Sequence, residues 1–236
     1  MKKILSIIFI CITISGFSQT DNVENIKMVN DHLFLYFFTN NWMDSPKGLE
    51  IKPQSISTDV YWMLSPIGRK SIVSLNIGYG FSAQSIKSNG ITYNDSLNKT
   101  HFDLGILDTV KYRKNKFATV FFDIPVELRI RTRPNLKHKN FKIALGFKAG
   151  ILIQSYIKYF GNEYRFPGID DEVKFKTYKT QNILPYRYGV YGRIGYGKFY
   201  LFGYYSLSKV FETNKGPDLT PINLGIGLSI YRSKTY

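Results

Sequence analysis

Residues 140–157 read NFKIALGFKAGILIQSYI, and this stretch decides the fold class because it is long and apolar yet contains Lys142 and Lys148. With a period of two, one face holds only apolar side chains, whereas the other holds the lysines, three small residues, Leu152 and Gln154. Strict alternation indicates a β-strand with an apolar and a polar face. A membrane helix is a poor alternative, since a charge near its centre costs about 2.5–3.5 kcal/mol.

The same alternation recurs along the chain. It is clean in SIVSLNIGYGFSAQ (71–84), FATVFFDIPVELRIR (117–131), YRYGVYGRIGYG (186–197) and INLGIGLSIY (222–231). Three further strands are predicted with less regular patterns at 30–42, 55–65 and 199–211. The total is eight, and single-chain bacterial outer-membrane barrels have an even number of strands.

Long and short connections alternate between these predicted strands. The long ones are 43–54, 86–116, 158–183 and 212–221, and the short ones are 66–70, 132–140 and 197–198. Outer-membrane barrels have long external loops and short periplasmic turns, so both chain ends are expected in the periplasm. Gly197 and Lys198 fit a two-residue hairpin loop of type II′, which places Tyr196 opposite Phe199.

A soluble β-sandwich is the alternative fold, but strands of up to 18 residues are long for it. A strand that spans the membrane needs about 9–11 residues. The sequence therefore predicts an all-β protein, an eight-stranded antiparallel transmembrane β-barrel of the up-and-down type. A cleaved signal peptide is expected to precede it.

The N-terminus, MKKILSIIFICITISGFSQT, has a basic start, an apolar run and small residues at Gly16 and Ser18. This pattern is typical of a secretory signal peptide, whereas the run is short for an anchor helix. We expect a signal peptide at 1–18, a barrel domain at 19–236, and export to the outer membrane of a Gram-negative cell. Cys11 is the only cysteine, so the mature chain has no disulfide.

The chain is strongly basic, with 32 Lys and Arg against 17 Asp and Glu and a net charge of +15. Export argues against nucleic acid as a partner. Outer-membrane lipid and lipopolysaccharide are the expected partners, and a solvated basic surface is the alternative. The aromatic content of 16% suits lipid-facing strands with interfacial girdles.

Two stretches carry a family resemblance. FFDIPVELRIRTRP (121–134) followed by NFKIALGFKAGILIQSYIKY (140–159) resembles the small, PorT-like outer-membrane β-barrel proteins of Bacteroidota. The later hairpin RIGYGKFYLFGYYSLSKVF and the closing LGIGLSI resemble them too. The resemblance implies an integral outer-membrane protein without implying an activity. Pro125 lies inside a strand of this barrel, where a proline is expected to mark a bulge or kink.

The inward face of the predicted strands carries many charges, and an eight-stranded barrel is filled mostly by its own side chains. We expect these charges to form a polar plug with a structural role, and a narrow anion-attracting pore is the alternative. In any register of the 132–140 turn, Lys148 should lie near Asp123 or Glu127. The inward charged residues are Asp123, Glu127, Arg129, Arg131, Lys142, Lys148, Arg187 and Arg193.

A barrel enzyme that modifies lipid A is the second alternative. Of the histidines His32, His101 and His138, only His101 is predicted on the outer side, and it lacks an evident serine and acid partner. Asp123 and Glu127 lie about 13 Å apart along a strand, too far for a glycosidase pair. No metal-ligand or cofactor motif is present, so a structural, adhesive or assembly role without a cofactor is expected.

Two basic clusters remain. KYRKNK, which is predicted to precede the strand at 117, lies at the outer rim and is a candidate contact for lipopolysaccharide phosphates. Its basic residues are Lys111, Arg113, Lys114 and Lys116. RIRTRPNLKHK (129–139) forms the predicted periplasmic turn, where anionic headgroups or a protein partner of the periplasm or outer membrane could bind.

Overall fold

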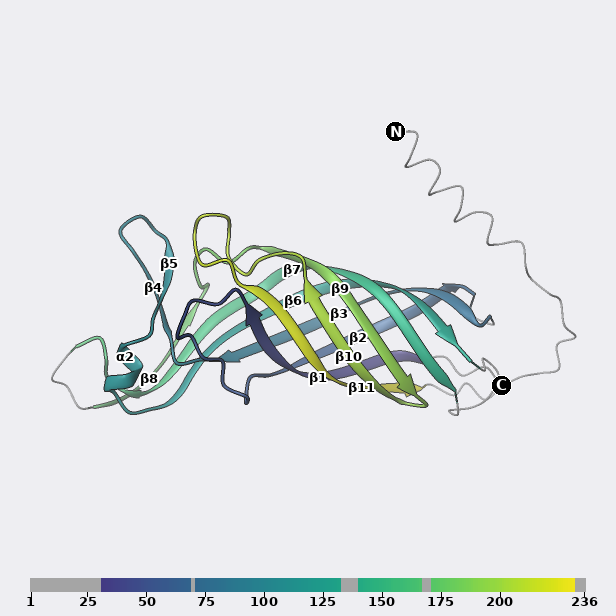
Figure 1. The fold of residues 1–236 in the computed structure, drawn as a ribbon, viewed down its shortest axis with the longest axis horizontal. Helices are drawn as coiled ribbons and strands as arrows, with labels where there is room; N and C mark the ends of the chain where they lie inside the picture. The colour runs from purple at the N-terminus through teal and green to yellow at the C-terminus, as the bar shows by residue number, and fades with distance from the viewer. Residues whose placement is uncertain (1–30, 69–70, 133–139, 167–170, 232–236) are drawn as a thin grey trace, which may run out of the picture.

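The computed structural model describes residues 31–68, 71–132, 140–166 and 171–231 (Figure 1). The predicted signal peptide at 1–18 and most of the predicted periplasmic turn lie outside these residues.

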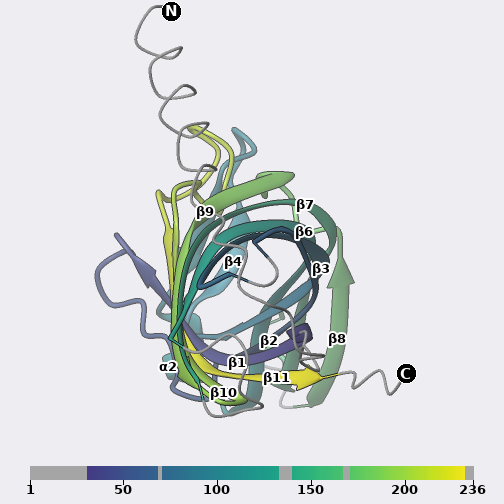
Figure 2. The ribbon, with the colours of Figure 1, turned by 90° about the vertical axis from the view of Figure 1, so that its right-hand side faces the viewer.

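Eight long antiparallel strands form a closed barrel, as the alternation predicts. Each strand pairs with the next along the chain, and the first pairs with the last to close the ring (Figure 2). The strands are β1 (Asp31–Met43), β2 (Ile56–Ile67), β3 (Val73–Lys87), β6 (Tyr112–Arg131), β7 (Phe141–Asn162), β9 (Tyr186–Tyr196), β10 (Phe199–Ser206) and β11 (Thr220–Tyr231).

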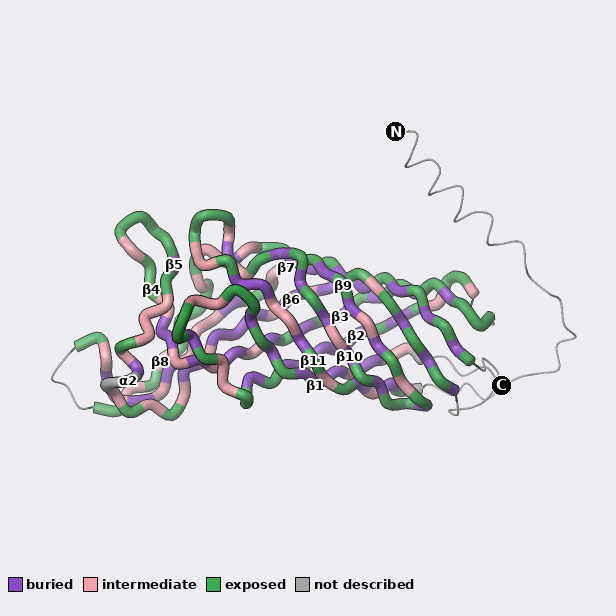
Figure 3. Tube along the Cα trace, in the orientation of Figure 1, coloured by how far each residue is buried: buried purple, intermediate pink, exposed green. Residues whose placement is uncertain are grey.

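Along each strand, exposed and buried residues alternate (Figure 3). Most outward side chains of the barrel are apolar and exposed, whereas many inward ones are polar or charged and buried: Leu145 is 69% exposed and Lys148 is 0% exposed. A soluble protein has the opposite arrangement. An apolar outer surface around a polar interior is the pattern of a barrel that lies in lipid, and it excludes the sandwich.

The connections alternate in length as predicted. Those at 44–55, 88–111, 163–185 and 207–219 are long and lie together at one end, on the left of Figure 1. The opposite end has the short turns, including Gly197–Lys198, where Tyr196 pairs with Phe199 as predicted. Gly197 has a φ of 62°, which glycine adopts without strain.

The long-loop end contains structure that the strand pattern did not predict. A hairpin of β4 (Ile91–Asn94) and β5 (Thr100–Asp103) precedes a one-turn helix, α2 (Ile106–Thr109). β8 (Glu172–Tyr178) pairs with the outer part of β7. β6 begins at Tyr112 and not at the predicted 117, so β6, β7 and β8 form a sheet that extends beyond the barrel. No helix in the described part of the chain is long and apolar enough to span a membrane.

A bulge or kink is predicted at Pro125, and the structure has no bulge there. Pro125 pairs with Lys148 in an unbroken register, and the ladder between β3 and β6 only omits Gly78 and Tyr79, which lie opposite Pro125 and Ile124. Proline has no N–H to donate to a neighbouring strand, so a local gap in the ladder accommodates it without a bulge.

The bulge lies instead in β7, where Ile153 has no partner between Gln154 and Leu152. It shifts the inward set from even to odd positions. Gln154, which was predicted to face inward, is therefore exposed. The strand predicted at 199–211 also ends earlier, at Ser206.

Candidate functional site

The half of the lumen nearer the short turns is centred on Glu127. Arg193 on β9 donates from Nε to Glu127 Oε2 at 3.0 Å, and Arg129 donates from Nη2 to Oε1 at 2.7 Å. The Tyr191 hydroxyl lies 3.1 Å from Oε2. Glu127 is 2% exposed, so its charge is held by ion pairs and hydrogen bonds away from solvent.

A second layer, one step towards the long loops, is centred on Asp123. Arg187 donates two hydrogen bonds to this carboxylate, from Nε to Oδ1 at 3.1 Å and from Nη2 to Oδ2. Lys148 Nζ lies 3.9 Å from Asp123 Oδ2 and 3.0 Å from Asp59 Oδ2 on β2. The Tyr61 hydroxyl bridges the two carboxylates, at 2.8 Å from Asp59 and 2.6 Å from Asp123.

Aromatic rings fill the space around these ions. The Arg193 guanidinium lies 4.1 Å from the centre of the Phe34 ring, and Lys148 Nζ lies 4.2 Å from that of Tyr204. Rings at these distances attract cations through their negative faces. The buried aromatic and methionine cluster of the lumen comprises Phe34, Tyr36, Phe38, Tyr61, Met63, Tyr191, Tyr200, Phe202 and Tyr204.

The remaining two predicted lumen cations lie at the short-turn end. Lys142 Nζ donates to the Gly197 carbonyl at 3.2 Å, and Arg131 Nη2 lies 3.3 Å from the carbonyl oxygens of Gly68 and Ser71. These two cations therefore contact turn backbone in addition to facing the lumen, whereas the other predicted cations hold carboxylates.

Sequence reasoning missed Asp59. The sequence did contain a signal, because Asp59 shares the period-two positions of Ser57, Tyr61 and Met63, which are all buried along β2. In the two central layers, the described residues place three buried carboxylates among four buried cations, and all lie at 6% exposure or less. Such an arrangement can block the lumen and cross-link its wall.

The outer surface carries a second arrangement, a row of four lysines in direct cross-strand register. Lys87 on β3 pairs with Lys116 on β6, Lys116 with Lys158 on β7, and Lys158 with Lys176 on β8. Because paired residues share a face, all four point outward. Like charges opposite each other destabilise a sheet. No salt bridge joins any of the four to an acidic residue in the described part of the chain.

Tyrosines flank the lysine row on the barrel side. Tyr156 on β7 pairs with Tyr178 on β8, and each tyrosine lies two residues from the lysine of its own strand, on the side of the barrel. Lys176 Nζ lies 3.9 Å from the centre of the Tyr156 ring, and Lys116 Nζ lies 5.7 Å from it. Exposed tyrosines next to an apolar band are typical of the aromatic girdle of an outer-membrane barrel.

The rim cluster predicted from KYRKNK is in part strand and not loop. Only Lys111 precedes β6. Arg113 pairs with Glu172 at 3.1 Å, and Lys114 lies opposite Phe160. Of the four predicted residues, Lys116 alone belongs to the lysine row.

Two carboxylates in the long connections are held in their charged form. The Lys99 backbone amide and His101 donate to Asp95 and lower the pKa of its carboxyl group. Hydrogen bonds from the Arg165 side chain and backbone lower the pKa of Glu163 to about 2. The described residues contain no cluster of three His, Cys, Asp or Glu side chains that could hold a metal ion.

Comparison with known proteins gives one match. Residues 33–212 match a family model described as "Outer membrane protein beta-barrel domain", which covers the barrel from β1 to just beyond β10. No curated protein and no solved structure matches the chain significantly.

Proposed function

Since the chain belongs to the outer membrane protein β-barrel domain family, we propose that it is an integral outer-membrane protein with a plugged lumen that acts through its outer end. The long loops face outward, and the lysine row binds the phosphate groups of lipopolysaccharide. Residues 1–18 direct export. The two motifs at 121–134 and 140–159 support a place in the PorT-like group of Bacteroidota.

The plug is supported by the two central charge layers. Glu127 and Asp123 connect to cations on β6, β7 and β9, and Asp59 connects β2 to β7 across the interior. An eight-stranded barrel leaves little space beyond its own side chains. The charges therefore serve stability, and the pore remains the alternative to be tested.

Conductance tests the plug. The purified barrel in a planar bilayer should give no unitary current, because the two layers block the lumen. The double variant Glu127→Ala/Arg193→Ala removes a matched pair from one layer only, so it should also stay closed, because the Asp123 layer remains in place. Stepwise anion-selective currents from the unsubstituted protein would establish the narrow pore instead.

Lipopolysaccharide binding is supported by the lysine row. Neighbouring strands are about 4.8 Å apart, so the Cα atoms of the four lysines span about 14 Å, which we place at the height of the headgroups. Their mutual repulsion is relieved by a bridging anion, and lysine binds phosphate as a point charge. Lipid A of lipopolysaccharide would supply such phosphates in the outer leaflet.

The binding test compares two charge-matched double variants. Lys116→Gln/Lys158→Gln should reduce the lipopolysaccharide that co-purifies with the barrel several-fold, measured by mass spectrometry of the extract. Lys47→Gln/Lys99→Gln removes the same charge from exposed loops and should leave it unchanged. Equal losses in both would show a non-specific effect of net charge.

The proposed role is not enzymatic: the protein acts in adhesion or in the assembly of a larger complex. Contrary to the expectation from the sequence, His101 has an acid partner, Asp95, at 2.9 Å, and its ring stacks on Tyr93 at 5.6 Å. No serine hydroxyl bonds to it in the described chain. Mass spectrometry of lipid A from a deletion strain checks this. A changed acyl or phosphate pattern would favour the lipid A-modifying enzyme, whereas co-purified proteins would identify an assembly partner.

A further inference from the structure

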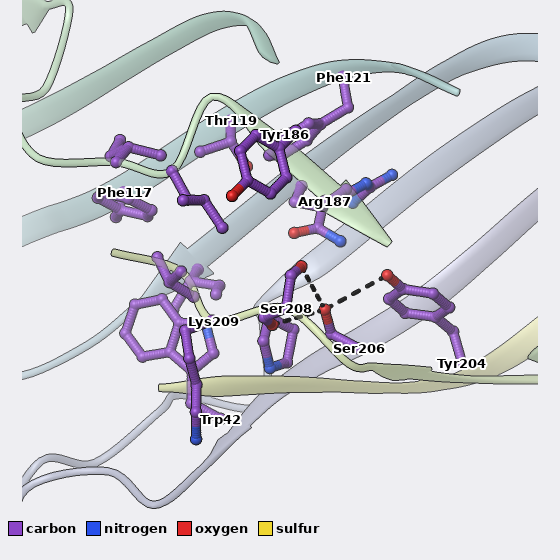
Figure 4. Close-up of a pocket in the computed structure, with 16 residues that line it drawn as sticks. Trp42, Phe117, Thr119, Phe121, Tyr186, Arg187, Tyr204, Ser206, Ser208 and Lys209 are labelled. Atoms are coloured by element: carbon purple, nitrogen blue, oxygen red, sulfur yellow. Dashed lines mark hydrogen bonds between the residues drawn. The ribbon is translucent and has the colours of Figure 1, made fainter. Parts of the chain in front are cut away.

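A cavity lies at the long-loop end of the barrel, next to the Asp123 layer, and Arg187 of that layer forms part of its wall (Figure 4). Its volume is about 460 Å³, including the part open to solvent. Its walls come from the ends of the barrel strands and the connections beside them: Trp42 on β1, Phe117 and Phe121 on β6, Ile183 before β9 and Val210 after β10. Ligand sites commonly have such a lining, mostly apolar with a few polar groups.

Two side chains that line this cavity each have a buried donor without a partner. Arg187 uses Nε and Nη2 for Asp123, and its Nη1 makes no hydrogen bond within the described residues. Gln84 Nε2 is likewise unpaired there. Arg187 is 6% exposed and Gln84 is 8% exposed, so both groups carry the cost of a buried, unsatisfied donor.

Three other polar residues of the cavity, Ser206, Ser208 and Lys209, already have partners. Ser206 Oγ donates to the Ser208 carbonyl oxygen at 2.8 Å and lies 3.1 Å from Ser208 Oγ, as Figure 4 shows. Lys209 Nζ lies 2.9 Å from Thr220 Oγ1. The unmet demand in the cavity is therefore for an acceptor near Arg187 and Gln84.

We propose that this cavity binds a small carboxylate with an apolar or aromatic body. The carboxylate accepts hydrogen bonds from Arg187 Nη1 and Gln84 Nε2, and the body packs against Trp42 and Phe117. A charged acceptor is favoured over a neutral one because bonds to ionised groups are about twice as strong. This site is separate from the lysine row.

The test uses 4-phenylbutyrate and its neutral counterpart 4-phenylbutan-1-ol, with the full barrel in nanodiscs and isothermal titration calorimetry. Empty nanodiscs correct for partition into lipid. The acid should bind with a Kd at least about tenfold lower than that of the alcohol. Equal affinities, or no binding of the acid, would overturn the proposal.

Variants at Gln84 locate the site. Gln84→Glu places a negative charge in the cavity and should weaken acid binding at least about tenfold while changing alcohol binding little. Gln54→Glu adds the same charge on an exposed loop and should not weaken it. Heat-modified migration on gels checks that each barrel is folded, and Gln84→Leu provides the test if Gln84→Glu does not fold. Unchanged acid affinity in both folded Gln84 variants would refute this location. The lysine-row double variant should bind the acid normally, so the two proposals fail independently.

Discussion

Lys148 on β7 and Asp59 on β2 form an ion pair of 3.0 Å across the barrel interior, although two strands, β3 and β6, separate β2 from β7 in the sheet. Both side chains are at most 1% exposed. The pair therefore ties together two parts of the wall that share no backbone hydrogen bonds. This explains why an apolar strand keeps a lysine in its interior.

Removal of the lysine should destabilise the barrel. Lys148→Met keeps most of the side-chain volume but leaves Asp59 as a buried charge without its main partner, a change that typically costs about 3–5 kcal/mol. The urea midpoint for loss of heat-modified migration should fall accordingly. Lys148→Met/Asp59→Asn removes both charges and should recover at least half of the loss.

A second rescue variant tests whether Asp59, as in the structure, or Asp123, as the sequence suggested, is the main partner of Lys148. Asp123 also lies within reach of Lys148, but it forms an ion pair with Arg187. Asp123→Asn would therefore leave the Arg187 guanidinium buried without its carboxylate partner. Lys148→Met/Asp123→Asn should therefore be no more stable than Lys148→Met. A better rescue by Asp123→Asn than by Asp59→Asn would contradict the assigned pairing.

The strands and the facing of the charges could be predicted because alternation is local. The register at Lys148 is one of those that the turn allowed, with Pro125 opposite. The bulge at Ile153 could not be predicted, since Ile151, Leu152 and Ile153 are all apolar and hide the change of face.

Contacts between strands that are distant in the sequence could not be predicted. Asp59 is 89 residues from Lys148, and no local pattern pairs them. The cavity depends on strand ends that meet only when the barrel closes. The Lys87, Lys116, Lys158 and Lys176 row needs three registers at once, one of which involves the unpredicted β8.

The lipid face predicts a position-dependent cost of charge. Leu145 points outward in mid-strand at 69% exposure, so Leu145→Arg should destabilise the barrel by about 2–4 kcal/mol in bilayers. Leu97 is 75% exposed in the β4–β5 turn, and Leu97→Arg should cost little. Folding titrations in lipid vesicles measure both, and equal tolerance would show that Leu145 does not face lipid.

The outer connection predicts a pH-dependent contact. Hydrogen bonds from Arg165 lower the pKa of Glu163 from 4.5 to about 2. A lowered carboxyl pKa means that the contact contributes fully above the ordinary pKa and is lost as pH falls towards 2. Carbon NMR of labelled side-chain carboxyls should give this midpoint, and Arg165→Gln should move it towards 4.5. An unchanged midpoint in the variant would rule out Arg165 as the cause.

The two ends of the barrel predict opposite accessibility in whole cells. Leu97 lies in a long connection, and Lys198 lies in the two-residue turn at the other end. Long loops face outward in barrels of this kind. Leu97→Cys should therefore react with an impermeant maleimide on intact cells, whereas Lys198→Cys should react only after permeabilisation. The native Cys11 is expected to leave with the signal peptide, so the unsubstituted protein is the blank, and label on it would show that residue 11 is retained. Label on Lys198→Cys alone would invert the orientation and place the lysine row and the cavity on the periplasmic side.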